Sequence, residues 1–235
     1  MAAVSKSGEY ETEFSDGSKK SFRAEVPEDI QLPVWSLEVE DWNEGEKKTI
    51  VEDRGLGIVT NEVYYETKKT LLPVGETELK PWREMEKAGP QVSGIGRYKT
   101  RITIPEAWEE NQGALLKIES TNGHSAAVYV NGKKAKPFDF DALAVDISDL
   151  LQSGENEICV EVASSLNNRL MARGYYEKGR EFSKQLSDNA NNAVDGSAEN
   201  REEDNRSDIF DIHPVVRDYG MTGEVKLIRY IRKEI

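Results

Sequence analysis

Short runs of alternating apolar and polar residues, each closed by a turn signal, constrain the fold of this chain more than any other feature. Val128–Val130 is β-branched and aromatic, and Asn131-Gly132 follows it. This dipeptide readily adopts the positive φ angles of a type I′ turn, so we predict a hairpin here. Ala144–Ile147 and Ile158–Val162 continue the alternation. Such spacing is typical of β-sandwiches and barrels rather than units with helical crossovers.

The same pattern extends to both ends of the chain. Asp16-Gly17 predicts a second hairpin, and "NEGEKKTIVEDRGLG" (43–57) is charged and glycine-punctuated, which predicts an exposed connection. The segments "ISDLLQSG" and "PEAWEENQG" allow a helical turn or two before glycine stops them. Further strands are predicted at residues 10–14, 21–26, 34–39, 63–67, 97–105, 114–120 and 224–231.

The charge balance limits the partners of the protein. The 235 residues include 44 acidic and 31 basic side chains, and the net charge is -13. Such a charge repels the phosphate backbone of nucleic acids and anionic membranes, so we expect neither as a partner. No apolar run approaches the roughly 18 residues that span a bilayer, and the first residues lack a secretory signal. The localisation stays open: intracellular, or secreted or periplasmic if the chain is cut from a longer one.

Cysteine chemistry has little support in this sequence. Cys159 is the only cysteine, which excludes an intramolecular disulfide. Because it lies within a predicted strand, we predict a small buried apolar residue rather than a nucleophile.

The segment from Ser183 to Asp208 has almost no large apolar residue and is rich in Asp, Asn, Glu and Ser. It cannot offset the entropy of ordering by burial, so we predict an acidic mobile loop at 183–208. Calcium is the one cofactor that this composition leaves open. Position three of the calcium-loop template is Ala193 instead of an oxygen ligand, so no metal site is assigned; the matching positions are Asn191, Asp195, Gly196 and Glu202.

Motifs of catalysis are not found. The sequence holds no phosphate-binding glycine loop, HExxH, zinc-ligand cluster or nucleophile elbow. Carboxylates are plentiful, but a glycosidase pair is defined by spatial separation that sequence spacing does not give. No catalytic residue is assigned.

The candidate binding residues lie in "SSLNNRLMARGYYEKGREF" (164–182), directly after a predicted strand. Amides and guanidinium groups can hydrogen-bond sugar hydroxyls in pairs, and tyrosine rings can stack on the apolar face of a sugar. We favour a structural or interface role over direct sugar contact, because Arg and Asn at a strand end often satisfy loop carbonyls and Tyr pairs often pack at a domain surface. The candidates are Asn167, Asn168, Arg169, Arg173, Tyr175 and Tyr176.

Several segments together resemble a known family. They are "VSGIGRYKTRITIPEAW", "AAVYVNGKKAKPFDFDALAVDISDLLQSGENEICVEVASSLNNRL" and "YGMTGEVKLIRY". They resemble the C-terminal galactose-binding-like β-sandwich of glycoside hydrolases related to the α-L-rhamnosidases of family 106 and, more loosely, the sugar-binding jelly roll of family 2 enzymes. The resemblance covers Val92–Tyr230 apart from the acidic segment, and "LPVWSLEVEDWNEG" and "ELKPWREM" extend it upstream.

The resemblance implies an all-β fold, an antiparallel jelly-roll-like β-sandwich of the galactose-binding-domain type with few short helices. We expect residues 91–235 to form it and residues 1–90 to be an irregular β-rich segment packing on it. The strand pattern predicts six inward-facing residues: Val128, Val130, Val145, Ile147, Val160 and Val162.

The catalytic carboxylates of such enzymes belong to a barrel domain, and nothing in these residues resembles one. The resemblance therefore implies a non-catalytic accessory or carbohydrate-binding module, whose partner is a carbohydrate or a catalytic barrel domain. The alternatives are a free-standing lectin-like sugar binder and a small glycosidase using surface carboxylates.

Overall fold

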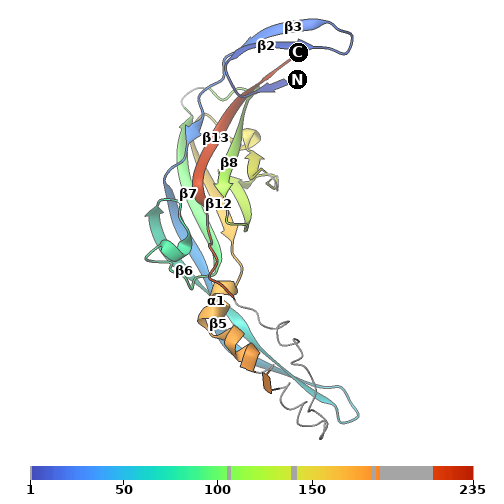
Figure 1. Ribbon diagram of the computed structural model, residues 1–235, viewed down its shortest axis with the longest axis vertical. Helices are drawn as coiled ribbons and strands as arrows, with labels where there is room; N and C mark the ends of the chain where they lie inside the picture. The colour runs from blue at the N-terminus through green and yellow to red at the C-terminus, as the bar shows by residue number, and fades with distance from the viewer. Residues whose placement is uncertain (1, 105–106, 139–141, 182–183, 186–213, 235) are drawn as a thin grey trace, which may run out of the picture.

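The computed structural model describes residues 2–104, 107–138, 142–181, 184–185 and 214–234. Its centre is two antiparallel sheets packed face to face, and projections extend from both ends of this elongated body (Figure 1). The prediction of an all-β, antiparallel sandwich with few short helices is confirmed.

One sheet has five strands in the order β1-β13-β8-β11, with β4 beside β13. At its centre Leu116 pairs with Leu227 on one side and with Val145 on the other, so apolar side chains form a row across the sheet. The strands are β1 (Ala2–Val4), β4 (Ile30–Gln31), β8 (Gln112–Ser120), β11 (Ala144–Asp146) and β13 (Thr222–Lys233).

The other sheet has six strands in the order β10-β9-β12-β7-β5-β6. Strands from both sides of residue 90 are thus hydrogen-bonded in the same sheets, while the division of the chain at that residue stays a prediction. The strands are β5 (Trp35–Asp53), β6 (Val59–Thr77), β7 (Gly94–Ile104), β9 (Ser125–Val130), β10 (Lys133–Lys134) and β12 (Gly154–Ala163).

Both predicted hairpins are present. Asn131 and Gly132 have φ angles of 51° and 77° and connect β9 to β10, as the turn type requires. Asp16-Gly17 lies between β2 (Gly8–Glu13) and β3 (Lys19–Ala24), which pair with each other at one end of the molecule (Figure 1).

The core lies between the two sheets, and all six residues predicted to face it are buried, with at most 3% of their surface exposed. The largest side chains that join them there are Trp35, Trp82, Tyr98 and Tyr219. The prediction of a buried Cys159 is wrong, because the alternation along β12 turns Val160 inward and leaves Cys159 partly exposed on the outer face.

The predicted connection at 43–57 is also wrong: β5 runs on to Asp53 and β6 begins at Val59. Residues 42–69 form a two-stranded ribbon beyond the sandwich, here called the β5–β6 arm (Figure 1). Because the arm has solvent on both faces, its strands carry charged residues, and their composition resembles that of a loop. Only the turn at 54–58 matches the predicted connection.

Helical structure is short. The predicted turn at 147–154 is the 3-10 helix η2 (Ser148–Leu150), and η1 spans Trp82–Glu84. The helical turn predicted in "PEAWEENQG" is wrong, because residues 107–113 form no helix. The α-helix α1 (Asn167–Ala172) and the helical residues 175–181 and 184–185 follow β12. No helix among the described residues is long and apolar enough to cross a membrane.

The predicted acidic loop lies outside the described residues, apart from Lys184 and Gln185. Its calcium-template positions therefore stay predictions.

Candidate functional site

Helix α1 closes the end of the sandwich from which the β5–β6 arm projects (Figure 1). Three of the six candidate residues, Asn167, Asn168 and Arg169, lie on this helix, and Arg173 directly follows it. We describe each by the groups that its side chain contacts.

Asn168 is buried, with 3% of its surface exposed. Its Nδ2 donates to the Arg217 carbonyl at 2.9 Å, and its Oδ1 accepts from the Arg217 amide at the same distance. Its backbone N–H donates to the Tyr219 hydroxyl at 3.2 Å. These bonds join α1 to the segment that leads into β13.

Asn167 makes a second connection to the same segment. Its Nδ2 donates to the Val215 carbonyl at 2.9 Å, and its Oδ1 accepts from the Tyr176 hydroxyl at 3.0 Å. The amide of Asn167 thus ties together α1, the following helical residues and the chain before β13.

Arg169 lies against β5. Its Nη2 donates to both carboxylate oxygens of Asp41, at 2.6 and 2.7 Å, and the two side chains are 14% and 11% exposed. The buried Ser93 completes the contact: its Oγ accepts from the Arg169 amide at 3.3 Å, and its own amide donates to Asp41. The arrangement holds α1 against the base of the arm.

Asp41 and Ser93 were not among the sequence candidates. A signal for Asp41 does exist, because Trp35, Leu37 and Val39 are the inward positions of β5 and Asp41 is the next one. A carboxylate in an inward position requires a partner. Ser93 has no comparable signal.

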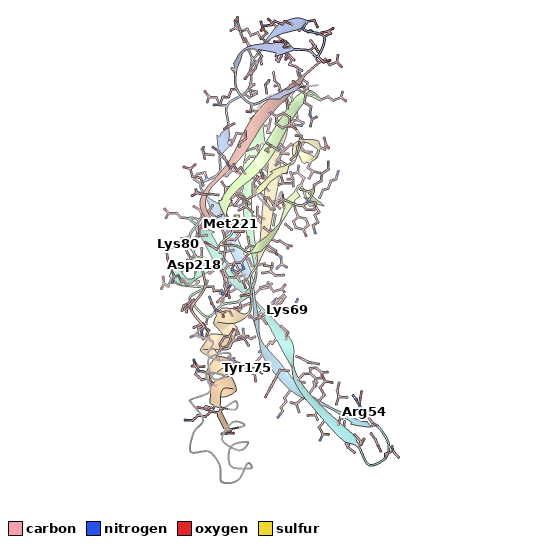
Figure 2. All side chains as sticks on the ribbon, turned by 45° about the vertical axis from the view of Figure 1, so that its right-hand side comes forward. Arg54, Lys69, Lys80, Tyr175, Asp218 and Met221 are labelled. Atoms are coloured by element: carbon pink, nitrogen blue, oxygen red, sulfur yellow. The ribbon has the colours of Figure 1, made fainter. Side chains whose placement is uncertain are left out.

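Two of the remaining candidates, Arg173 and Tyr175, face solvent. Tyr175 is 53% exposed and Arg173 is exposed, while Tyr176 is half-buried. Figure 2 shows Tyr175 on the helical segment that leaves the sandwich at the same end as the arm. The structure therefore brings Asn167, Asn168 and Arg169 together in contacts within the chain and leaves Arg173 and Tyr175 available to a ligand.

Ionisable residues gather on the outer face of the six-stranded sheet. Glu40 accepts from Trp42 Nε1 at 2.8 Å and lies 3.0 Å from Lys69 Nζ and 3.3 Å from Arg97. The hydrogen bond from Trp42, followed by that from Lys69, lowers the pKa of Glu40 to about 2. Arg97 also binds Glu161 at 2.8 Å.

Glu40 does not suit the role of a general acid. A general acid must hold a proton near neutral pH, and the low pKa of Glu40 keeps it ionised. Burial raises the pKa of the Cys159 thiol, which opposes thiolate formation. Within the part of the chain that the structure describes, no three His, Cys, Asp or Glu side chains are placed to hold a metal ion.

Comparison with known proteins gives structural similarities only. No family model matches the chain, and no curated protein matches it in sequence. A rhamnosidase from Novosphingobium sp. PP1Y is 16% identical with a TM-score of 0.46, covering 96% of this chain and 16% of its own. A glycosyl hydrolase family 2 member from Bacteroides cellulosilyticus DSM 14838 is 16% identical with a TM-score of 0.40, covering 86% and 20%.

A third similar structure is a β-glucuronidase from an uncultured Clostridium sp., 14% identical with a TM-score of 0.41, covering 89% of this chain and 29% of its own. The chain spans less than a third of each of these three proteins.

Proposed function

We propose that this chain is a non-catalytic accessory module of a glycoside hydrolase related to the α-L-rhamnosidases, and that it serves to dock against another part of the enzyme. The observation that carries the proposal is the set of hydrogen bonds that Asn168 and Arg169 make within the chain. Their polar groups, which a sugar site or active site would present to its ligand, are bonded within the chain to Arg217, Tyr219 and Asp41. They organise the end of the sandwich from which α1 and the arm project.

The outer-face carboxylates support the same proposal. Glu40 and Glu161 both bind Arg97, so a guanidinium lies between the two carboxylates, whereas a glycosidase pair leaves that space to its substrate. The expected partner is a catalytic barrel domain of the same enzyme.

The test of the non-catalytic role is hydrolysis by the purified chain. We expect no release of chromophore from aryl rhamnosides, galactosides or glucosides above the buffer rate. Glu40→Gln and Glu161→Gln are the informative variants, and Glu86→Gln, an exposed carboxylate near η1, is the matched control. Turnover that disappears in Glu40→Gln or Glu161→Gln but persists in the control would establish a glycosidase instead.

Gene context provides an independent test. A barrel domain encoded in the same polypeptide favours the accessory module. Its absence favours the free-standing lectin-like binder.

Weak carbohydrate binding is a second candidate function, favoured by the exposure of both Tyr175 and Arg173. A tyrosine ring and a guanidinium group supply the stacking face and the paired donors that a sugar needs. Each contact adds about 1 kcal/mol net because water competes, so these two residues alone should bind a sugar with a Kd of several millimolar.

Heteronuclear NMR titration with oligosaccharides containing rhamnose and galactose tests this second function. We expect shifts at residues 173–176 that Tyr175→Ala abolishes. Phe14→Ala, an exposed aromatic residue between β2 and β3, is the control that should leave binding intact. Shifts located elsewhere, or unchanged binding in Tyr175→Ala, would assign the cluster a structural role.

A further inference from the structure

The β5–β6 arm extends well past the rest of its sheet. Pairing between β5 and β7 ends at Asp41 and Gly94, whereas pairing between β5 and β6 continues to Asp53 and Val59. Figure 2 shows Arg54 at the tip of the arm and Lys69 at its base. A two-stranded ribbon is marginally stable by itself in water, so a long arm of this kind gains from a further partner.

A β-bulge determines which residues share each face of the arm. Glu44 pairs with Thr67 and Lys47 with Tyr65, so Gly45 and Glu46 lie opposite the single residue Glu66. A Cβ at Gly45 would lie 2.7 Å from the Glu66 carbonyl oxygen, which explains the glycine. Beyond the bulge the alternation of β5 is reversed.

On β5 the reversal turns Val51 to the outer face of the arm, the face that also carries Lys69 and Trp42. Directly paired residues point to the same face, which places Val51 and Val63 on this side. Four apolar side chains there are between 43% and 63% exposed: Val51, Val59, Val63 and Tyr65. An exposed apolar set of this size marks an interaction surface.

The inner face of the arm carries fewer exposed apolar side chains, Ile50 and Tyr64, each 42% exposed. There Lys48 lies 2.8 Å from Glu46 and 3.8 Å from Glu66, and Glu52 lies 3.3 Å from Arg54. Glu62 and Lys68 lie on this face as well, opposite Ile50 and Asn43 of β5.

The edge of β6 is unpaired. Among the described residues β6 pairs with β5 alone, so the backbone groups on its other side are open to an added strand. We propose that a second copy of this chain pairs antiparallel with this edge of β6, with Tyr65 of each copy at the two-fold axis. The two arms then form a four-stranded ribbon in which Val59, Val63 and Tyr65 of both copies share the outer face.

Charge complementarity selects this register. Centred on Tyr65, the pairing places Glu62 of each copy opposite Lys68 of the other, in two equivalent contacts. On the outer face, Val59 lies opposite Leu71, which is 58% exposed.

Neighbouring registers are less favourable. A pairing centred on Tyr64 opposes Glu62 to Glu66, and one centred on Glu66 opposes that carboxylate to its own copy. A pairing centred on Thr67 extends the ladder to Pro73, which has no N–H to donate.

The arm is also the part of the protein that a second copy can approach at low electrostatic cost. The chain carries a net charge of -13, but residues 42–69 hold six acidic and five basic side chains. Contact through the arm therefore avoids most of the repulsion between two acidic bodies.

Sedimentation velocity of the whole chain over the micromolar range, with charge-reversal variants, tests the proposal. We expect a concentration-dependent dimer that Glu62→Lys or Lys68→Glu each weakens by about tenfold, because each puts like charges opposite one another twice. The double variant should restore the wild-type Kd. Glu86→Lys and Lys80→Glu, both exposed and outside the arm, are matched controls.

Cysteine cross-linking tests the register separately. On a Cys159→Ala background, Tyr65→Cys should form an intermolecular disulfide and Lys68→Cys should not, because position 65 alone faces itself. A monomer at every concentration would overturn the proposal, as would a dimer whose Kd ignores the charge reversals. Neither result bears on the hydrolysis test, so this proposal and the proposed function can fail independently.

Discussion

Arg169 of α1 binds Asp41 of β5 through a single nitrogen, Nη2, which lies 2.6 Å from Oδ1 and 2.7 Å from Oδ2. Helix α1 has six residues, too few to be stable by itself. The ion pair therefore holds it against β5, and the bonds of Asn168 hold it against the segment that leads into β13.

Arg169→Ala should lower the free energy of unfolding by about 3 kcal/mol, because it leaves the Asp41 carboxylate buried without its cation. Urea denaturation measures the change. Arg101→Ala is the control, since its ion pairs with Glu155 and Glu157 are long and its side chain is 67% exposed. That variant should change stability by less than about 0.5 kcal/mol. Equal effects of the two variants would contradict the anchoring role of Arg169.

Tyr98→Phe should cost about 2 kcal/mol at neutral pH, because the Tyr98 hydroxyl accepts from Trp82 Nε1 at 2.7 Å and from the Met221 amide at 3.2 Å. Both donors are buried and would lose this partner. Chemical denaturation at pH 7 measures the loss, with Tyr175→Phe as the exposed control. A cost no larger than that of the control would contradict this expectation.

The pKa of the same hydroxyl predicts that the stability of the protein falls at alkaline pH. Burial raises the pKa of Tyr98 from 10.0 to about 12. The folded state therefore holds this proton more tightly than the unfolded state, and the associated stability is complete below pH 10 and lost as pH rises through about 12. We expect wild-type stability to fall more steeply over this window than that of Tyr98→Phe. Parallel curves would contradict the assignment.

The low pKa of Glu40 predicts that the stability of the protein falls at acid pH. Hydrogen bonds from Trp42 and Lys69 lower the pKa of Glu40 from 4.5 to about 2, so its stabilisation is present above pH 4.5 and is lost as pH falls through about 2. Because water reaches these groups, we expect roughly 1 kcal/mol. Thermal melts of Glu40→Gln should show a flatter acid limb than those of the wild type. Glu86→Gln should retain the wild-type slope.

Val160→Ala should destabilise the protein by roughly 1 to 3 kcal/mol, because it removes buried methyl groups between the sheets. Cys159→Ser is the matched control, since the neighbouring residue of the same strand points outward and is partly exposed. Its effect should be below about 1 kcal/mol. A comparable loss in both variants would contradict the inward–outward alternation of β12.

Calcium should have little effect on the chain. The third template position in the 183–208 segment is Ala193, which offers no oxygen ligand. We therefore expect millimolar calcium to leave the thermal midpoint of unfolding unchanged in calorimetry. A marked rise would show a ligand bound to the native state.

The sequence by itself determined the local β-structure and the central core. Strand alternation is a property of neighbouring residues, so β12 and its inward Val160 and Val162 could be predicted from their own segment. The Asn131-Gly132 turn was equally predictable, because its positive φ angles are a local preference of these two residues.

Only the tertiary structure decided what the polar residues do. The residues around Arg169 do not indicate that its partner is Asp41, which lies 128 residues away in the sequence. The two side chains pair because α1 packs against the end of the sandwich at which β5 leaves it. The β5–β6 arm was not predicted for a related reason. A ribbon with solvent on both faces has the composition of a loop, and only the hydrogen bonds between β5 and β6 define its residues as strands. Local preferences of neighbouring residues determine strands and turns. The ion-pair partner of a charged side chain, and the strand that pairs with a given strand, depend on which distant residues the fold places next to it.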